Sequence, residues 1–210
     1  SGNAQPYRRN GNLGSDNMGF YFFAMLSRMK YITRWALMRN IRTENISEHT
    51  NDVAVLSHAL AVLTNRRFGG NVDVTKCVLI ALYHDAPEIL TGDMPTPVKY
   101  YNSSIREAYK QVEKVSGEKL LSMLPQDLVD EYEPLIIDDG RWQEERLIVR
   151  AADKLSALIK CIEEQRQGNH EFDKARRSTE KAVRNMKLPA ADCFLEEFLP
   201  SYKLTLDEQE

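Results

Sequence analysis

The sequence has few cysteines and no long hydrophobic segment. Cys77, Cys161 and Cys193 are the three cysteines among 210 residues, and each lies in a separate apolar stretch. This spacing builds neither a Cys-x-x-Cys metal motif nor a disulfide framework, so we expect reduced core thiols and a cytoplasmic location. No segment approaches the roughly 18 uninterrupted apolar residues of a membrane span, and we therefore expect no membrane association.

The chain also lacks an excess of charge of either sign. Its net charge is -3, with 28% charged residues, which gives no electrostatic footprint for a nucleic acid polymer. Residues 1–17 are polar and rich in Gly and Asn, without the apolar core of a signal peptide. We expect them to be a disordered leader or a cloning remnant, and residues 18–210 to form a single domain.

Alternation typical of strands is absent, and helical periodicity recurs along the chain, so the sequence predicts an all-α fold. Ser47 is expected to cap one helix and Asp73 the next, whereas Pro134 is expected in a loop. The predicted helices cover residues 20–32, 47–65, 74–85, 102–124, 144–167, 170–186 and 190–198, with a shorter one after Pro125.

A polar pair interrupts the most apolar of these helices. The run from Cys77 to Leu82 leads into His84 and Asp85. Burying an ionised carboxylate costs several kcal/mol unless a cation or hydrogen bonds compensate, and a divalent metal ion is the natural candidate. Pro87 forbids a regular continuation of the helix, which places Glu88 about one turn beyond a bend.

Two further residues are candidate ligands with an ordinary alternative. His49 shares a helical face with core positions 53, 56, 60 and 63, where a histidine is more often a core residue than a ligand, while His58 lies on the opposite side. Asp153 lies opposite the main apolar stripe of its helix, among small and apolar neighbours. It is either a buried carboxylate or a half-exposed one paired with Lys154 or Arg150.

Together, His49, His84, Asp85 and Asp153 form a set of two imidazoles and two carboxylates. Such a set suits Zn, Mn, Fe or Co, and the lack of thiolates argues against a closed structural zinc site. An ion held there would acidify a bound water and clamp a phosphoryl oxygen. Glu88 would orient or deprotonate that water and then protonate the leaving oxygen.

Two loops carry candidate substrate contacts. In the first, residues 33–45, the Arg34 guanidinium suits phosphate oxygens and the Trp35 indole offers a flat face to a ring. For any single arginine in such a segment, however, a plain surface position is the more common case. In the second, residues 91–97, Asp93 and Thr96 are the side chains suited to fixing a polar ligand.

These motifs in order resemble a known family. The H…HD…D pattern, with Arg42-Thr-Glu-Asn-x-Ser-Glu-His49, Phe68-Gly-Gly-Asn and Thr91-Gly-Asp-x-Pro-Thr-Pro-Val-Lys99, is similar to the HD-domain metal-dependent phosphohydrolases, and among them to the bacterial 5′-deoxynucleotidases. The similarity runs from about Phe22 through Leu206. One departure is Pro87, where the family often has Ser, and it bears on the pose of Glu88.

The resemblance implies an HD-domain helical bundle with the metal site between helices, usually a homodimer. It also implies hydrolysis of deoxyribonucleoside 5′-monophosphates to deoxyribonucleoside and phosphate. One divalent ion per chain is implied, with Co²⁺ favoured and Mn²⁺, Zn²⁺, Cu²⁺ or Fe²⁺ as alternatives. By position, the metal ligands would be His49, His84, Asp85 and Asp153; Glu88 would be catalytic; and Arg34, Trp35, Asp93 and Thr96 would bind the nucleotide.

Three other functions stay open: a dNTP triphosphohydrolase, a phosphodiesterase, and a nucleotide sensor that binds metal without turnover. A two-metal phosphodiesterase needs further ligands, and only His58 and His170 remain among the histidines. A triphosphohydrolase would require more cationic residues near the motif than the sequence supplies. Glu88 argues against the sensor.

Overall fold

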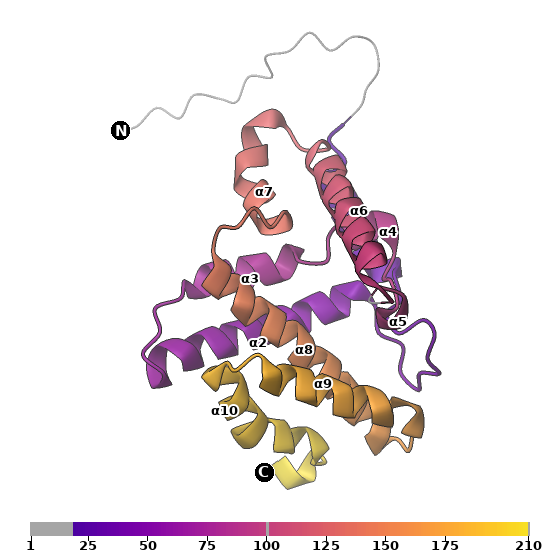
Figure 1. Cartoon of the computed structure of the whole chain (residues 1–210), viewed down its shortest axis with the longest axis vertical. Helices are drawn as coiled ribbons and strands as arrows, with labels where there is room; N and C mark the ends of the chain where they lie inside the picture. The colour runs from indigo at the N-terminus through magenta and orange to yellow at the C-terminus, as the bar shows by residue number, and fades with distance from the viewer. Residues whose placement is uncertain (1–18, 100, 210) are drawn as a thin grey trace.

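The computed structural model describes residues 19–99 and 101–209, and every regular element within them is helical (Figure 1). The all-α prediction is confirmed, whereas the predicted leader, residues 1–17, lies outside the described residues. The α-helices are α1 (Phe22–Leu26), α2 (Ile46–Arg67), α3 (Val74–Tyr83), α4 (Glu88–Thr91), α5 (Thr96–Lys99), α6 (Ser103–Leu121), α7 (Val129–Ile136), α8 (Gln143–Arg166), α9 (Asp173–Asn185) and α10 (Pro189–Glu197). Short 3₁₀ turns connect several of them, such as Ser27–Tyr31 and His170–Phe172.

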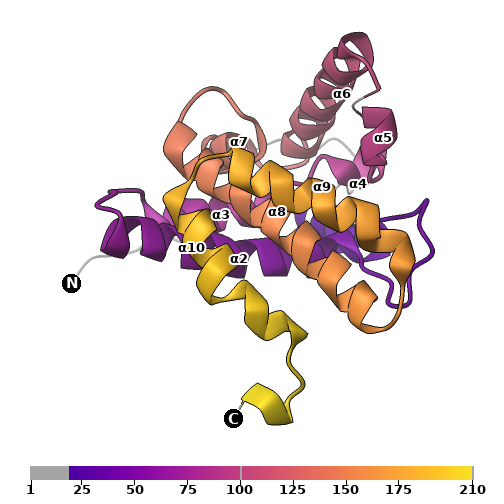
Figure 2. The same ribbon diagram turned by 60° about the horizontal axis from the view of Figure 1, so that its bottom comes forward.

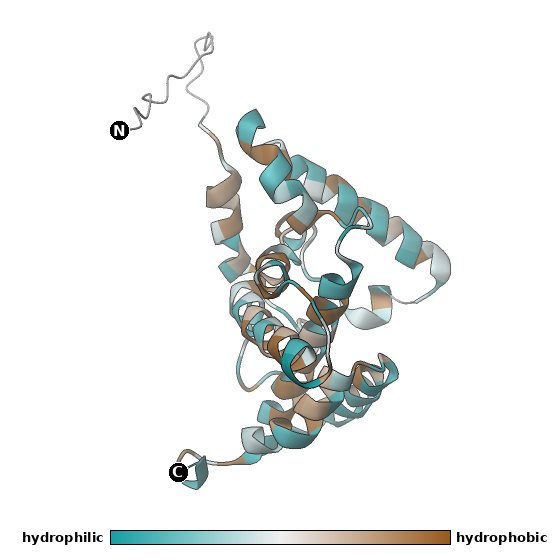
Figure 3. Cartoon of the chain, turned by 90° about the vertical axis from the view of Figure 1, so that its left-hand side faces the viewer, coloured by the Kyte–Doolittle hydropathy of each residue, from teal (hydrophilic) through white to brown (hydrophobic). Residues whose placement is uncertain are grey.

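Helices α2, α3 and α8 pack against one another at the centre of the molecule (Figure 1). Helices α4, α5 and α6 lie together on one side of this centre in both ribbon views, and α9 and α10 cover α8 and α2 (Figures 1 and 2). Hydrophobic positions concentrate on the central helices, and hydrophilic ones on the outer helices (Figure 3). Helices α2, α3 and α8 therefore form the hydrophobic centre of the fold.

The start of α2 differs from the prediction. Asn45, not Ser47, is the N-cap: its side chain accepts a hydrogen bond from Glu48 N at 3.0 Å, and Glu48 Oε2 accepts one from Asn45 N at 3.1 Å. This reciprocal pair satisfies two backbone donors and so outcompetes a single serine cap. The cap at Asp73 is confirmed, because its carboxylate accepts from Lys76 N at 3.0 Å.

The buried face of α2 matches the predicted stripe, with His49 fully buried beside the apolar positions and His58 exposed. Among the described residues, the buried apolar side chains form two clusters, a large one around α2, α3 and α8 and a smaller one around Phe22 and the end of α6. Tyr83 packs against both clusters. The residues that follow it therefore leave α3 where the two cores meet.

The chain turns sharply after Tyr83, as Pro87 predicts. Helix α3 ends two residues earlier than expected, with His84 as its C-cap, and Glu88 N donates to Asp85 O at 3.0 Å across the turn. Glu88 then opens the short helix α4. The turn puts His84, Asp85 and Glu88 on one compact segment.

Two smaller expectations were wrong. Pro134 lies inside α7, near its end, where its carbonyl oxygen accepts a hydrogen bond from Arg146 at 2.6 Å and stabilises the last turn. Cys77 and Cys161 are buried free thiols, but Cys193 is only half-buried because its sulfur contacts Arg67 and Glu197 at the surface.

In the described chain no helix combines the length and the apolar character that crossing a membrane requires.

Candidate metal and substrate site

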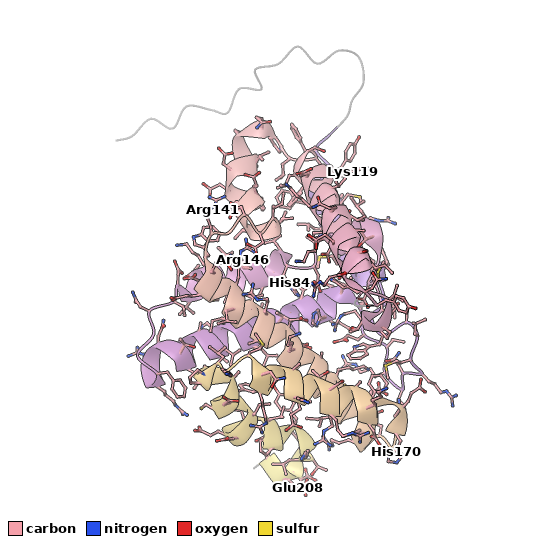
Figure 4. All side chains as sticks on the ribbon, viewed as in Figure 1. His84, Lys119, Arg141, Arg146, His170 and Glu208 are labelled. Atoms are coloured by element: carbon pink, nitrogen blue, oxygen red, sulfur yellow. The ribbon has the colours of Figure 1, made fainter. Side chains whose placement is uncertain are left out.

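The four predicted ligands converge from three parts of the fold. His49 lies in the first turn of α2, His84 and Asp85 follow α3, and Asp153 lies in the middle of α8. His49 Nε2 is 3.5 Å from Asp85 Oδ2 and 3.2 Å from Asp153 Oδ1, and His84 Nε2 is 3.2 Å from Asp85 Oδ2. Figure 4 shows His84 in the interior, whereas His170 lies at the outer end of α8.

Both imidazole rings are oriented by a partner on their Nδ1 side. His84 Nδ1 lies 2.7 Å from Ala81 O, and because a carbonyl oxygen only accepts, this nitrogen carries the proton. His49 Nδ1 lies 3.1 Å from Ser156 Oγ. On both rings this arrangement leaves Nε2 directed at the carboxylates and available to coordinate a metal ion.

The Nε2 atoms of His49 and His84 are buried, and in the described part of the chain neither makes a hydrogen bond of acceptable geometry. Ligand atoms of His49, His84 and Asp85 all lie within 4.8 Å of one another. Buried polar groups without a partner are rare and costly. Two such nitrogens beside two carboxylates fit a divalent cation, which would satisfy all of them.

Electrostatics favour charged carboxylates at this point. Burial opposes ionisation of Asp85, but the neighbouring His84 lowers the pKa of Asp85 to about 2. Burial by itself lowers the pKa of His84, yet the Asp85 carboxylate outweighs it and raises that pKa to about 9. Burial also disfavours the charge of Asp153, and proximity to His49 depresses its pKa all the same. Both aspartates are thus anionic at neutral pH.

Asp153 is half-exposed, but it does not form the surface pair expected of a half-exposed aspartate. Its side chain is 39% exposed, and its ion-pair partner is His49. Among the described residues it forms no ion pair with Lys154 or Arg150. The carboxylate therefore faces the histidines.

Glu88 differs in character from the aspartates. It is 7% exposed, and its Oε2 has no hydrogen-bond partner within the described residues. Burial, reinforced by the charges of Asp85 and Asp93, raises the pKa of Glu88 to about 9, while Lys99 and Arg34 act in the opposite direction. At neutral pH this carboxyl group keeps its proton and can donate it.

The predicted substrate residues occupy different environments. Arg34 and Trp35 are both held by Glu44, through Arg34 Nη1 at 2.9 Å and Trp35 Nε1 at 3.0 Å from the same oxygen, Oε2. Burial raises the pKa of Asp93, and the positive charge of Arg34 opposes that rise. Asp93 and Arg34 are therefore close enough for their charges to interact. Thr96 is exposed at the first position of α5.

Comparison with known proteins shows the family of this chain. The model of the 5′-deoxynucleotidase YfbR-like family matches residues 21–202. A 5′-deoxynucleotidase of Klebsiella pneumoniae and the 5′-deoxynucleotidase YfbR of Escherichia coli are each 50% identical to the chain over 188 residues, which cover 90% of this chain and 94% of each relative. The chain belongs to the YfbR-like 5′-deoxynucleotidase family.

Solved structures agree on the fold of this YfbR-like chain. An HD-domain phosphohydrolase from Listeria innocua superposes with a TM-score of 0.78 at 23% identity, covering 91% of this chain and 93% of that one. A cyanophage S-2L HD phosphohydrolase, bound to dA and one catalytic Zn²⁺, has a TM-score of 0.60 at 19% identity, covering 87% and 96%. The predicted HD-domain helical bundle is thereby confirmed.

Sequence reasoning missed three residues that shape this YfbR-like site. Glu44 lies within a motif that pointed to the family, so its position was a usable signal. Ser156 gave none beyond being a small residue near Asp153. Lys99 was visible as a cation at the end of the second loop, and in the structure its Nζ pairs with Glu113 Oε1 at 2.8 Å.

Proposed function

We propose that this chain hydrolyses deoxyribonucleoside 5′-monophosphates to deoxyribonucleoside and phosphate, using one divalent metal ion. The observation that carries the proposal is the pair of buried, unpartnered Nε2 atoms of His49 and His84 beside Asp85 and Asp153. The 5′-deoxynucleotidases that are half identical to the chain supply the substrate class.

The metal would be held by His49, His84, Asp85 and Asp153. When bound, such an ion supplies Lewis-acid activation of water and of a phosphoryl oxygen. Co²⁺ is our first choice, with Mn²⁺, Zn²⁺, Cu²⁺ and Fe²⁺ as alternatives, because imidazole and carboxylate ligands accept all of them. The Zn²⁺ in the cyanophage HD phosphohydrolase supports a divalent ion at a site on this fold.

Glu88 is the proposed catalytic acid. Water attacks phosphorus, the bond between phosphorus and the 5′-oxygen breaks, and Glu88 gives its proton to that leaving oxygen. The Glu88 carboxylate then takes up the proton released by the attacking water, which restores the acid. The raised pKa of about 9 keeps the required proton on Glu88 at neutral pH. Arg34 offsets charge on the phosphoryl group, and Trp35, Asp93 and Thr96 contact the rest of the nucleotide.

Charge at the site favours a monophosphate over a triphosphate. The cations whose charges act on Glu88 are Lys99 and Arg34. Each already has an acidic partner, since Lys99 pairs with Glu113 and Arg34 with Glu44. Little positive charge remains to neutralise a triphosphate tail.

We also propose that the protein is a cytoplasmic homodimer whose residues 18–210 act as one domain. The buried free thiols of Cys77 and Cys161 support a reducing compartment. Exposed apolar side chains on and before α6 support a subunit contact: Val98, Tyr101, Ile105, Val112 and Val115. Sedimentation equilibrium tests this assignment, and a monomer at micromolar concentration would remove the dimer.

A phosphate-release panel tests the function. The protein is stripped with a chelator, reloaded with each divalent ion and offered deoxyribonucleoside and ribonucleoside monophosphates, deoxynucleoside triphosphates and cyclic nucleotides. We expect turnover of the deoxyribonucleoside monophosphates alone, lost on stripping and in Glu88→Ala with metal still bound. Turnover of triphosphates or cyclic substrates would overturn the proposal, and metal binding without any turnover would favour a sensor.

A further inference from the structure

Glu44 is a buried carboxylate outside the metal site with two unusual partners. It is 8% exposed, and one of its oxygens, Oε2, accepts from both the guanidinium of Arg34 and the indole of Trp35. Its backbone is engaged with the same segment, because Glu44 O accepts from Arg34 N at 2.9 Å. Backbone and side chain of one residue thus hold two neighbouring residues.

The backbone of Trp35 requires such support. Its φ is 60°, in the left-handed region, which costs a residue other than glycine of the order of 1 to 2 kcal/mol. Besides the bond to Glu44, its ring packs against Phe172 at 5.3 Å, and its carbonyl oxygen accepts from Asn40 Nδ2 at 3.2 Å and Met38 N at 2.9 Å. Glu44 and Phe172 therefore hold the indole in one orientation, and the two hydrogen bonds to the carbonyl oxygen hold the backbone.

Arg34 is held at one edge only. Its Nη1 bonds to Glu44, and in the part of the chain that the structure describes the guanidinium makes no other hydrogen bond. An arginine has five N–H donors in a fixed plane, so the remaining donors stay free once one edge is fixed. Burial lowers the pKa of Arg34, but the charge of Glu44, together with those of the aspartates at the proposed metal site and of Asp93, outweighs burial and raises that pKa, so the guanidinium lies near the proposed metal site.

We propose that Glu44 is a positioning residue for substrate binding: it fixes one edge of the Arg34 guanidinium and the Trp35 indole on a single oxygen, so that the free edge of Arg34 faces the substrate phosphate. This inference rests on the proposed roles of Arg34 and Trp35. Glu44 touches neither the substrate nor the metal ligands in this arrangement. Its contribution is to binding and not to the chemical step.

Glu44 could also weaken phosphate binding, which is the opposite of the effect that we propose. A carboxylate bonded to Arg34 also neutralises part of its charge, so that removing it would strengthen phosphate binding if charge alone mattered. Orientation dominates in our inference for two reasons. Free edges of Arg34 remain available while Glu44 is bound, and loss of the Glu44 charge also weakens the hydrogen bond from a second side chain, Trp35.

Glu44→Gln tests the inference with little change of shape. An amide oxygen in the place of Oε2 can still accept from Arg34 and Trp35, but both hydrogen bonds become neutral, so the charge-assisted bond that fixes the guanidinium is weakened. We expect KM for a deoxyribonucleoside monophosphate to rise about tenfold, with kcat within threefold of wild type. Inorganic phosphate should inhibit about tenfold more weakly, and Co²⁺ affinity should stay unchanged. Charge-assisted hydrogen bonds contribute enough for shifts of this size.

Controls separate positioning from folding and from the proposed function. Glu48→Gln removes a charge four residues away, and because glutamine also serves in a capping box, KM should stay within twofold. Trp35 fluorescence, recorded in a Trp142→Phe background, should change in Glu44→Gln and not in Glu48→Gln. An unchanged or lowered KM in Glu44→Gln overturns the inference when Arg34→Ala and Trp35→Ala raise KM. If those two variants leave KM unchanged, the proposed substrate roles fail as well.

Discussion

Nδ1 of His49 lies 3.1 Å from the hydroxyl oxygen of Ser156, on the ring edge away from the nitrogen that approaches Asp85 and Asp153. A hydroxyl group both donates and accepts, so it can satisfy either tautomer of the ring. Coordination of a metal ion through Nε2, as proposed, would select the tautomer in which Nδ1–H donates to Ser156. Ser156 would then orient a proposed ligand without binding the ion itself.

Removal of this hydroxyl should weaken metal binding. We expect Ser156→Ala to lower Co²⁺ affinity by about 10- to 100-fold, the range typical of partners that orient a ligating histidine. Titration calorimetry of the stripped protein measures it. Ser57→Ala is the matched control, since Ser57 is a buried serine of α2 whose hydroxyl has no partner within the described chain. Equal affinities for Ser156→Ala and wild type would show that the ring is oriented by packing alone.

The sequence predicted the helical class, the bend at Pro87 and a buried polar pair at His84 and Asp85, because each has a local cause: periodicity, a missing N–H group, or a charge at the end of an apolar run. Only the family resemblance added His49 and Asp153 to that pair as predicted ligands. It did not predict that Glu44 would reach back to Arg34 and Trp35. That contact depends on how residues 33–45 fold, and their irregular sequence carries no periodicity from which to infer it. The contact between Ser156 and His49 likewise joins two helices, α8 and α2, and residue spacing along the sequence does not predict it.

Metal affinity should depend on pH through His84. The apo protein holds a proton on this imidazole up to about pH 9, because the Asp85 carboxylate stabilises the charged form. Binding must displace that proton, so Co²⁺ affinity should rise with pH between 6 and 8, by up to about tenfold per unit. Calorimetry at pH 7 in two buffers of different ionisation enthalpy should detect proton release. His58→Ala, at an exposed histidine, should leave the release unchanged, whereas a pH-independent affinity would contradict the assignment of His84.

Glu88 should act on the chemical step alone. Glu88→Gln preserves the shape of the side chain but cannot transfer a proton, and we expect kcat to fall by about 10² to 10⁴. Co²⁺ affinity should change by less than threefold, because Glu88 is not one of the proposed ligands. Glu118→Gln, at a carboxylate on α6 whose one ion pair among the described residues is with Lys114 at 3.9 Å, should retain full activity. A fall in metal affinity that matched the fall in kcat would instead make Glu88 a ligand.

The loop that carries Arg34 and Trp35 should depend for its stability on a second buried carboxylate, Glu164. This side chain is fully buried and accepts from Ile41 N at 2.9 Å and Arg42 N at 3.1 Å, while Lys160 supplies the compensating charge.

Glu164→Ala leaves these backbone donors without a partner and the buried ammonium of Lys160 without its counter-charge, and we expect the free energy of unfolding to fall by about 3 kcal/mol in urea titrations. Although burial opposes ionisation, the bond from Lys160 and the other donors lower the pKa of Glu164 to about 2. Its stabilisation is therefore complete above about pH 4.5 and is lost as the pH falls toward 2, which the alanine variant should not show. Glu163→Ala, at the half-buried neighbour, should cost less than about 1 kcal/mol, and equal losses for the two variants would remove the special role of Glu164.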